Sequence, residues 1–252
     1  GISPDLNGYT PAQSVAFFQR VEDAVAALPG VTAVSGSRVA LISGSNWNSS
    51  VGVQGFEAGP DTNASSATTS VGPGFFRTLG IPLITGREFT RADVLGAPKV
   101  AIVNQAFARK FNLGNDVVGK RMSAGRDAAD LDIEIVGLVQ DAKYSEVRDA
   151  IPPQFFTPYA QDERAGSLSF YARASGDGAA MLASVQAAVR GLDPNLPIES
   201  PKTMAQQVTD SSNAAAQAAI DVADVAEAAR AVQTLVIDSG RQVGEARTAT
   251  KR

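Results

Sequence analysis

The chain of 252 residues contains no histidine and no cysteine. These two absences exclude the Ser-His-Asp and Cys-His nucleophile systems, and they remove the usual ligands of zinc, haem and iron–sulfur sites. Only carboxylate, lysine, tyrosine or serine–lysine chemistry remains open to an enzyme of this composition. The lack of cysteine does not fix the compartment, because a sufficiently large core needs no disulfide bond.

Long apolar runs are also missing. No window reaches the roughly 18 consecutive apolar residues that a membrane-spanning helix needs, and the first residues, GISPDLNGYTP, are too polar for a signal peptide. The net charge is -4, the pI is near 5.0, and the lysines and arginines are scattered, which argues against nucleic acid as a partner. With 44% hydrophobic residues, the sequence predicts a soluble folded chain or an excised part of a larger protein.

Two segments of the chain share one pattern. Thr10 and Pro11 form a helix start, and apolar residues then recur every three or four positions up to Pro29-Gly30, after which residues 31–42 favour one or two strands. Near the other end, residues 167–175 alternate as a strand does, residues 181–192 favour a helix, and LPIES favours a short strand. Two helix–turn–strand units predict a split βαβ, ferredoxin-like layer.

A segment of different composition, residues 59–163, separates the two units. Its pattern predicts short helices at 75–79 and 105–112 and strands at 98–104 and 132–141. We therefore expect an α+β fold in which residues 11–58 and 164–209 form a discontinuous subdomain. Residues 59–163 would form an inserted mixed α/β subdomain, after an N-terminal linker of residues 1–10.

The tail, residues 210–252, is rich in alanine: ten of the 18 residues from Ala214 to Ala231 are Ala. This composition favours a helix, and Val222, Val225, Val232 and Val236 fall at heptad positions along it. Two interpretations stay open, a terminal helix packed on its own domain and a stalk or partner-binding surface.

Two motifs are similar to those of catalytic or nucleotide-binding sites. GNDVVGKR, residues 114–121, matches G-x-x-x-x-G-K, but Arg121 stands where a phosphate loop needs Ser or Thr, and the predicted order is helix, turn, strand. We expect a turn at this motif.

The second motif is a set of three acids, Asp130, Asp132 and Glu134, that alternate along a predicted strand. They could present paired acids to a substrate or a metal. We favour a solvated strand face, with Leu131, Ile133 and Ile135 buried on the opposite side.

The stretch VGPGFFRTLGIPLITGREFTRAD, residues 71–93, combines turns and a small core. Gly80 and Gly86 suit positive φ, Arg87 and Glu88 could form a local pair, and the apolar residues Phe75, Phe76, Leu79, Ile81 and Leu83 would pack together. Trp47 is a candidate for an exposed functional residue, because its neighbours in SGSNWNSSVG are too polar for a core strand. We expect Trp47 in a loop, where it is a candidate partner contact.

Five segments stand out within residues 71–144: GFFRTLGIPL, the GREF turn, VAIVNQAFARKF, the VVGKR turn and DIEIVGLVQDAKY. Together they resemble the MacB-like periplasmic core domain of bacterial ABC-transporter permeases. The likeness is closest to the duplicated orphan permeases of Acidobacteria and extends over residues 11–209. It implies a porter-like layer with an inserted subdomain. The sequence departs from the family after TMAQQV, where such permeases continue into an apolar membrane segment and this chain becomes alanine-rich and polar.

The resemblance implies a non-enzymatic domain on the periplasmic side of the inner membrane, with no catalytic residues, no cofactor and no metal. Its implied partners are the transmembrane helices of its own permease, a cytoplasmic ABC ATPase acting indirectly, and a second permease copy or a periplasmic adaptor. The leading hypothesis is mechanotransmission: coupling of the ATPase cycle to substrate or partner proteins, as in efflux. The alternatives are a ligand- or peptide-binding module with its site between the two subdomains, and an acid-based hydrolase.

Overall fold

A computed structural model of the chain describes residues 1–45, 47–59, 62–125, 130–142, 151–214 and 216–217. The helices are α1 (Pro11–Ala26), α2 (Phe75–Leu79), α3 (Gln105–Lys110) and α4 (Gly178–Leu192), with 3-10 turns η1 (Pro4–Asn7) and η2 (Tyr159–Gln161). The strands are β1 (Val31–Ser37), β2 (Trp47–Val53), β3 (Ser65–Val71), β4 (Leu83–Gly86), β5 (Val100–Asn104), β6 (Arg121–Ala124), β7 (Ile133–Val139), β8 (Gln154–Pro158) and β9 (Ser169–Ala174). The predicted α+β class is confirmed.

Six of these strands close into a ring. The strand order is β2-β6-β7-β5-β8-β3, and β2 pairs with β3 as well as with β6, so that the first and last strands of this series are neighbours. The pairs β3–β8 and β5–β7 are parallel, while β2–β3, β2–β6, β6–β7 and β5–β8 are antiparallel. Closure removes the unpaired edges that an open sheet would leave.

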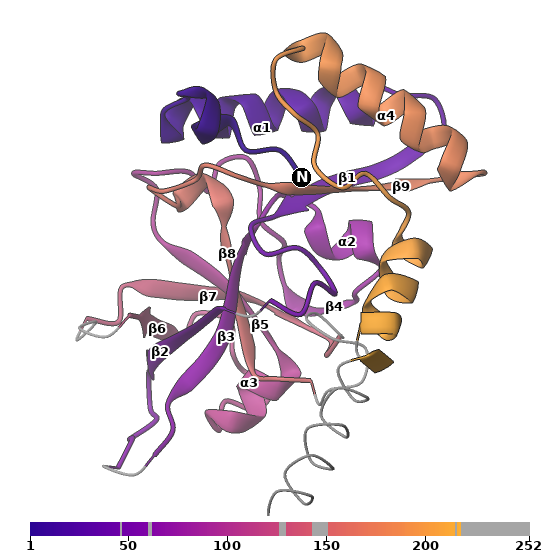
Figure 1. Cartoon of the computed structure of the whole chain (residues 1–252). Helices are drawn as coiled ribbons and strands as arrows, with labels where there is room; N and C mark the ends of the chain where they lie inside the picture. Colours follow the sequence, from indigo (N-terminus) through magenta and orange to yellow (C-terminus); the bar gives the residue numbers. More distant parts are fainter. Residues whose placement is uncertain (46, 60–61, 126–129, 143–150, 215, 218–252) are drawn as a thin grey trace, which may run out of the picture. The chain divides into compact units, whose positions relative to one another are not determined.

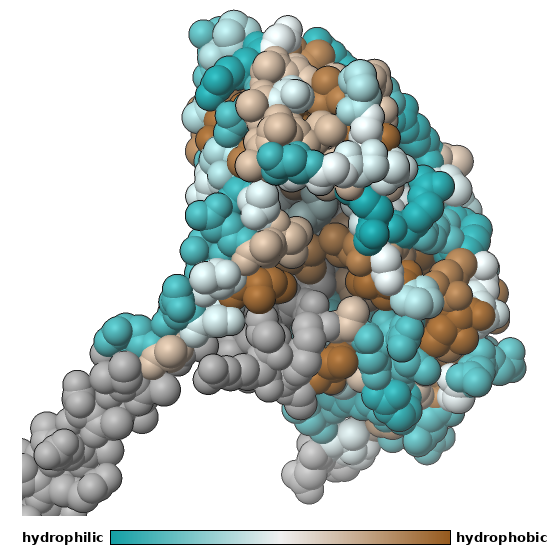
Figure 2. All heavy atoms as spheres, turned by 90° about the vertical axis from the view of Figure 1, so that its right-hand side faces the viewer, coloured by the Kyte–Doolittle hydropathy of each residue, from teal (hydrophilic) through white to brown (hydrophobic). Residues whose placement is uncertain are grey.

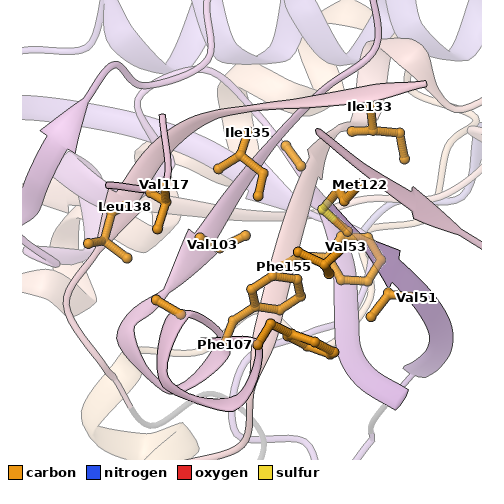
Figure 3. Packing of buried hydrophobic residues seen from close by; sticks show 13 residues of the cluster. Val51, Val53, Val103, Phe107, Val117, Met122, Ile133, Ile135, Leu138 and Phe155 are labelled. Carbon is orange, nitrogen blue, oxygen red and sulfur yellow. The ribbon is translucent and has the colours of Figure 1, made fainter. Parts of the chain in front are cut away.

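The ring is filled by apolar side chains from its strands and from α3, and Figure 3 shows them converging on one interior. Alternate residues of a strand point to the same face, so β2 contributes Val51 and Val53 while α3 contributes Phe107. We call this set the ring core; its buried members are Val51, Val53, Ala101, Val103, Phe107, Ala108, Phe111, Val117, Met122, Ile133, Ile135, Leu138 and Phe155.

A second layer extends from the ring. The end of β3 pairs with β1, which pairs in turn with β9 along residues 31–37 and 169–174, all antiparallel. Helices α1 and α4 lie on one side of β1 and β9, and α2 lies on the other (Figure 1). The buried apolar residues under α1 and α4 form the helix-side core: Ile2, Phe17, Phe18, Val21, Val25, Tyr159, Ala165, Leu168, Val189 and Leu196.

Helix α1 begins where the sequence predicts. The Thr10 hydroxyl accepts a hydrogen bond from the backbone N–H of Gln13, and the Gln13 side chain accepts one from the backbone N–H of Thr10, which satisfies two donors that a helix start leaves free. Pro11 occupies the first helical position, where its missing N–H costs nothing.

The start of the chain lies beside residue 199. Gly1 and Glu199 exchange two backbone hydrogen bonds of 2.8 Å, and Ile2 forms a β-bridge with Leu168. The strand predicted for LPIES is wrong: these residues are not part of the sheet, because Pro197 and Pro201 lack the N–H donors of a regular ladder. Glu199 nevertheless contacts the start of the chain, through the two bonds with Gly1 and by accepting a hydrogen bond from the Ser3 hydroxyl at 3.0 Å.

The chain divides into two compact units, Gly1–Gln207 and Val208–Arg252. All the elements named above belong to the first. In the second, residues 208–214 are helical, and the predicted heptad positions from Val222 onward lie outside the described residues. The predicted division of the first unit into residues 11–58 with 164–209, and residues 59–163, stays a prediction.

Candidate functional site

Trp47 lines a surface pocket of about 310 Å³ together with Arg38, Asp162 and Arg164. The fold brings these residues together because β1 and β2 follow one another along the same edge of β3. Arg38 comes directly after β1, Trp47 is the first residue of β2, and Asp162 and Arg164 follow η2. The expected loop position of Trp47 is wrong, because its backbone pairs with Thr68 of β3 in spite of its polar neighbours.

The Arg38 guanidinium organises this pocket. Its Nη1 donates to Oδ2 of Asp162 at 2.6 Å and to the backbone carbonyl of Arg164 at 2.8 Å, and its Cζ lies 5.3 Å from the centroid of the Trp47 ring. The Arg38 and Asp162 side chains are largely buried, so their ion pair is better shielded from water than an ordinary surface pair. A cation at this distance from a ring face favours a fixed orientation of the indole.

Sequence reasoning missed a second cluster, inside the helix-side core. Glu22 on α1 is 4% exposed, and its Oε1 has no hydrogen-bond partner among the described residues. The same holds for the Ser35 hydroxyl on β1 and the Tyr159 hydroxyl on η2. A Cβ placed on Gly72 would lie 2.7 Å from Glu22 Oε1, 2.8 Å from Ser35 Oγ and 2.9 Å from Tyr159 Cε1, so these three side chains converge on one point.

Burial raises the pKa of Glu22 to about 7, although the neighbouring Tyr159 hydroxyl and then the charge of Arg91 act in the opposite direction. Burial, and then the negative charge of Glu22, likewise raise the pKa of Tyr159. A signal for this site was present in the sequence: Glu22 stands four residues after Phe18 and three before Val25, on the apolar face of the helix.

The GNDVVGKR motif is a turn, as predicted. It joins α3 to β6, and Gly114 and Gly119 adopt φ of 60° and 84°. A phosphate loop would have to run from a strand into a helix, which is the reverse of the order here.

The acids of the predicted strand face do not converge. Asp132 forms an exposed ion pair with Lys99 at 2.6 Å, Asp130 is exposed, and β7 begins only at Ile133. Ile133 and Ile135 are buried, as the solvated-face interpretation expects. Within the described parts of the chain, no group of three or more acidic side chains is arranged to hold a metal ion.

The stretch 71–93 packs largely as expected, with two corrections. Gly80 and Gly86 have φ of 72° and 80°, and Phe75 and Phe76 are fully buried beside Phe156. The expected pair of Arg87 and Glu88 is wrong: Arg87 donates to both carboxylate oxygens of Asp93 at 2.9 Å, a fork geometry that Glu88 cannot offer, while Glu88 accepts from the backbone of Arg77.

Leu83, expected in the small core of this stretch, is 37% exposed, because it lies on β4 at the outer edge of β7. Ile84 on the same strand is exposed as well, as are Leu95 and Val118. On the face shown in Figure 2, apolar residues gather in the middle, with mostly polar residues below them and a mixture of polar and apolar residues above. None of the helices within the described residues is both long and apolar enough to cross a membrane.

Comparison with known proteins identifies a family for the chain. No curated protein has a significantly similar sequence. Among solved structures, the chain is similar to the periplasmic region of MacB from Actinobacillus actinomycetemcomitans, with 16% identity, a TM-score of 0.47, and coverage of 75% of this chain and 81% of that one. It is also similar to the extracellular domain of the ABC-type transporter YknZ from Gram-positive bacteria, with 15% identity, a TM-score of 0.46, and coverage of 70% and 82%.

The family model described as the MacB-like periplasmic core domain matches residues 3–235, which is most of the sequence. The chain therefore belongs to the MacB-like periplasmic core domains, a family of domains of ABC-transporter permeases.

Proposed function

We propose that the chain is a non-catalytic domain on the extracytoplasmic side of the inner membrane that couples the cycle of a cytoplasmic ATPase to substrate or partner proteins. The observation that carries this proposal is the pairing of Gly1 with Glu199. Residue 1 and the segment that follows residue 199 therefore lie side by side, so a movement of residues 200–207 would act on the unit close to its first residue.

Gln207 connects the segment after Glu199 to a loop of the folded unit. The Gln207 side-chain amide donates to the backbone carbonyls of Leu41 and Ile42, at 3.1 and 2.7 Å. The loop that carries Leu41 and Ile42 runs from Arg38 to Trp47, the two residues that frame the pocket on this side. A shift of the segment after Glu199 would therefore reach the pocket through one loop.

The test uses the full permease with its ATPase in lipid nanodiscs. Because the chain has no cysteine, Ser184→Cys on α4 and Asn115→Cys after α3 can be spin-labelled specifically within this domain, both positions being exposed. We expect the distance distribution between the labels to change when the ATPase is trapped in its nucleotide-bound state. Gln207→Ala should reduce that change, and Gln206→Ala, on the neighbouring exposed position, should leave it intact.

An unchanged distribution in every nucleotide state would contradict coupling through this domain. ATP hydrolysis by the purified chain above a blank would contradict the non-catalytic part of the proposal. The two outcomes are independent, because the first needs the whole transporter and the second needs only the chain.

A second candidate function, a ligand- or peptide-binding module, is favoured by the pocket at Trp47. Its lining residues come from both sides of the predicted boundary at residues 163 and 164, where a site between the subdomains is expected. A ligand that binds only the folded chain raises its melting temperature with concentration. A rise that continues with the logarithm of the ligand concentration would support this function, whether or not the domain also transmits motion.

A further inference from the structure

The charges around the pocket do not cancel. Both oxygens of the Asp162 carboxylate are engaged: Oδ2 accepts from Arg38 at 2.6 Å, and Oδ1 accepts from the backbone N–H of Arg164 at 2.9 Å. The Arg164 guanidinium itself is exposed and has no ionic or hydrogen-bonding partner among the described residues. Among the four lining residues, two guanidinium groups and one carboxylate leave one positive charge, carried by Arg164; the exposed Glu163 between Asp162 and Arg164 is not a lining residue.

Beside this free cation lies an apolar surface. The Trp47 side chain is 45% exposed although the Arg38 guanidinium lies against it. Since Arg38 is held by Asp162 and by the Arg164 backbone, the indole has a fixed neighbour and keeps its remaining surface open to solvent. An exposed aromatic side chain in a defined position is a common anchor for a ligand or partner.

We propose that this pocket binds a carboxylate that stands next to an aromatic or aliphatic group. The carboxylate pairs with the Arg164 guanidinium, which offers two parallel N–H donors to the two carboxylate oxygens. The apolar group packs on the exposed surface of Trp47. A volume of about 310 Å³ accommodates a group of the size of one amino-acid residue. The proposal gives the ligand-binding function suggested above its ligand chemistry, and rests on that function rather than on coupling.

The sequence supplies a direct reporter, because Trp47 is the only tryptophan in the chain. Its fluorescence, and the single indole N–H signal of a 15N-labelled sample, report on this pocket alone. The probe is N-acetyl-L-phenylalanine, and the matched control is its neutral amide, N-acetyl-L-phenylalaninamide. We expect the acid to shift both signals with saturation in the millimolar range, and the amide to produce a much smaller shift.

Two arginine variants separate the pocket from general charge effects. Arg164→Gln removes the free cation, and binding of the acid should weaken by at least about tenfold, the value of one charge-assisted hydrogen-bonded pair. Arg190→Gln on α4 removes an equal charge from an exposed position that does not line the pocket, and binding should stay unchanged. Melting curves of both variants confirm that they remain folded.

A capped peptide, acetyl-Gly-Phe-Glu-Gly-amide, identifies the source of the carboxylate. Tighter binding of the peptide than of N-acetyl-L-phenylalanine assigns the pocket to an acidic segment of a partner protein, and the reverse order assigns it to a small organic acid. The proposal is overturned if neither probe gives a saturable shift, if the amide binds as tightly as the acid, or if Arg190→Gln weakens binding as much as Arg164→Gln does. None of these results bears on the distance measurement in the full transporter, so coupling and ligand binding can fail separately.

Discussion

The two cores of the first unit are built differently. The ring core contains apolar side chains from five of the ring strands, from α3 and from the turn that follows it, and its aromatic members pack closely, with the Phe107 and Phe111 ring centroids 4.5 Å apart. The helix-side core contains comparable apolar residues but also encloses the polar side chains of Glu22 and Tyr159, which face each other, and the Ser35 hydroxyl, which lacks a partner among the described residues. Unpaired buried polar atoms cost free energy of folding.

This difference identifies the helix-side core as the region whose packing stabilises the domain less. Selection for stability alone would favour an apolar residue at position 22, because the surrounding positions of α1 are apolar. The polar cluster lies under α1, next to the segment that begins at Gly1, whereas the ring core lies around α3. The contact between α1 and the sheet is therefore the less optimised of the two, which is compatible with the motion that the proposed coupling function requires.

The largest expected effect is in the ring core. Phe107→Ala removes a fully buried ring that contacts Phe111 and Phe155, and a cavity of this size should lower the free energy of unfolding by about 3–5 kcal/mol. Urea denaturation followed by Trp47 fluorescence measures it, because Trp47 lies on a strand of the ring. Leu6→Ala, at a position that is 78% exposed, is the control and should change stability by less than about 0.5 kcal/mol. A loss below about 1 kcal/mol in Phe107→Ala would mean that the ring core is not the stable part.

The next effect concerns pH and the helix-side core. Folding raises the pKa of Glu22 from its ordinary value of 4.5 to about 7, so the folded state binds this proton more tightly than the unfolded state. The stability that results is fully present below pH 4.5 and is lost as the pH rises to about 7. Ionised Glu22 then costs about 3 kcal/mol relative to the protonated form.

Glu22→Gln removes this pH dependence, since an amide does not ionise in this range. We expect the variant and the parent chain to differ little near pH 4.5 and the variant to be more stable by up to about 3 kcal/mol at pH 8. Chemical denaturation at a series of pH values measures the difference. Glu57→Gln, at an exposed position, should show none. A stability difference for Glu22→Gln that is constant from pH 4.5 to 8 would exclude Glu22 as a titrating group in this range.

The smallest effect tests the packing around the same cluster. Gly72→Ala places a methyl group within 2.9 Å of Glu22, Ser35 and Tyr159, and overpacking of this kind should cost about 1–3 kcal/mol. Gly191→Ala on α4 is the matched change, because a Cβ there meets nothing within 4 Å. It should stabilise the helix by up to about 1 kcal/mol. Equal effects of the two substitutions on the melting temperature would show that the cluster has room to adjust.

Local patterns in the sequence were enough for most elements. The Thr10-Pro11 start of α1, the short helix at residues 75–79, and the turns at Gly80, Gly86 and GNDVVGKR follow from capping, periodicity and φ preferences, which act over a few residues. The strand at Trp47–Val53 did not follow, because its polar residues carry no strand signal and its conformation comes from hydrogen bonds to β3 and β6. The partner of Arg87 is Asp93 rather than its neighbour Glu88, because the turn at residues 90–93 brings both Asp93 oxygens within reach of the Arg87 guanidinium.

By itself the sequence determined the α+β class, the family resemblance and the absence of histidine and cysteine chemistry, since these depend on composition and on short-range order. Only the tertiary structure decided which residues meet. It closed six strands into a ring, placed Arg38, Trp47, Asp162 and Arg164 around one pocket, and buried Glu22 against Ser35 and Tyr159. These sites join residues more than 100 positions apart, and no local preference encodes such a contact, because it is fixed by strand pairing and by the packing of α1 on the sheet.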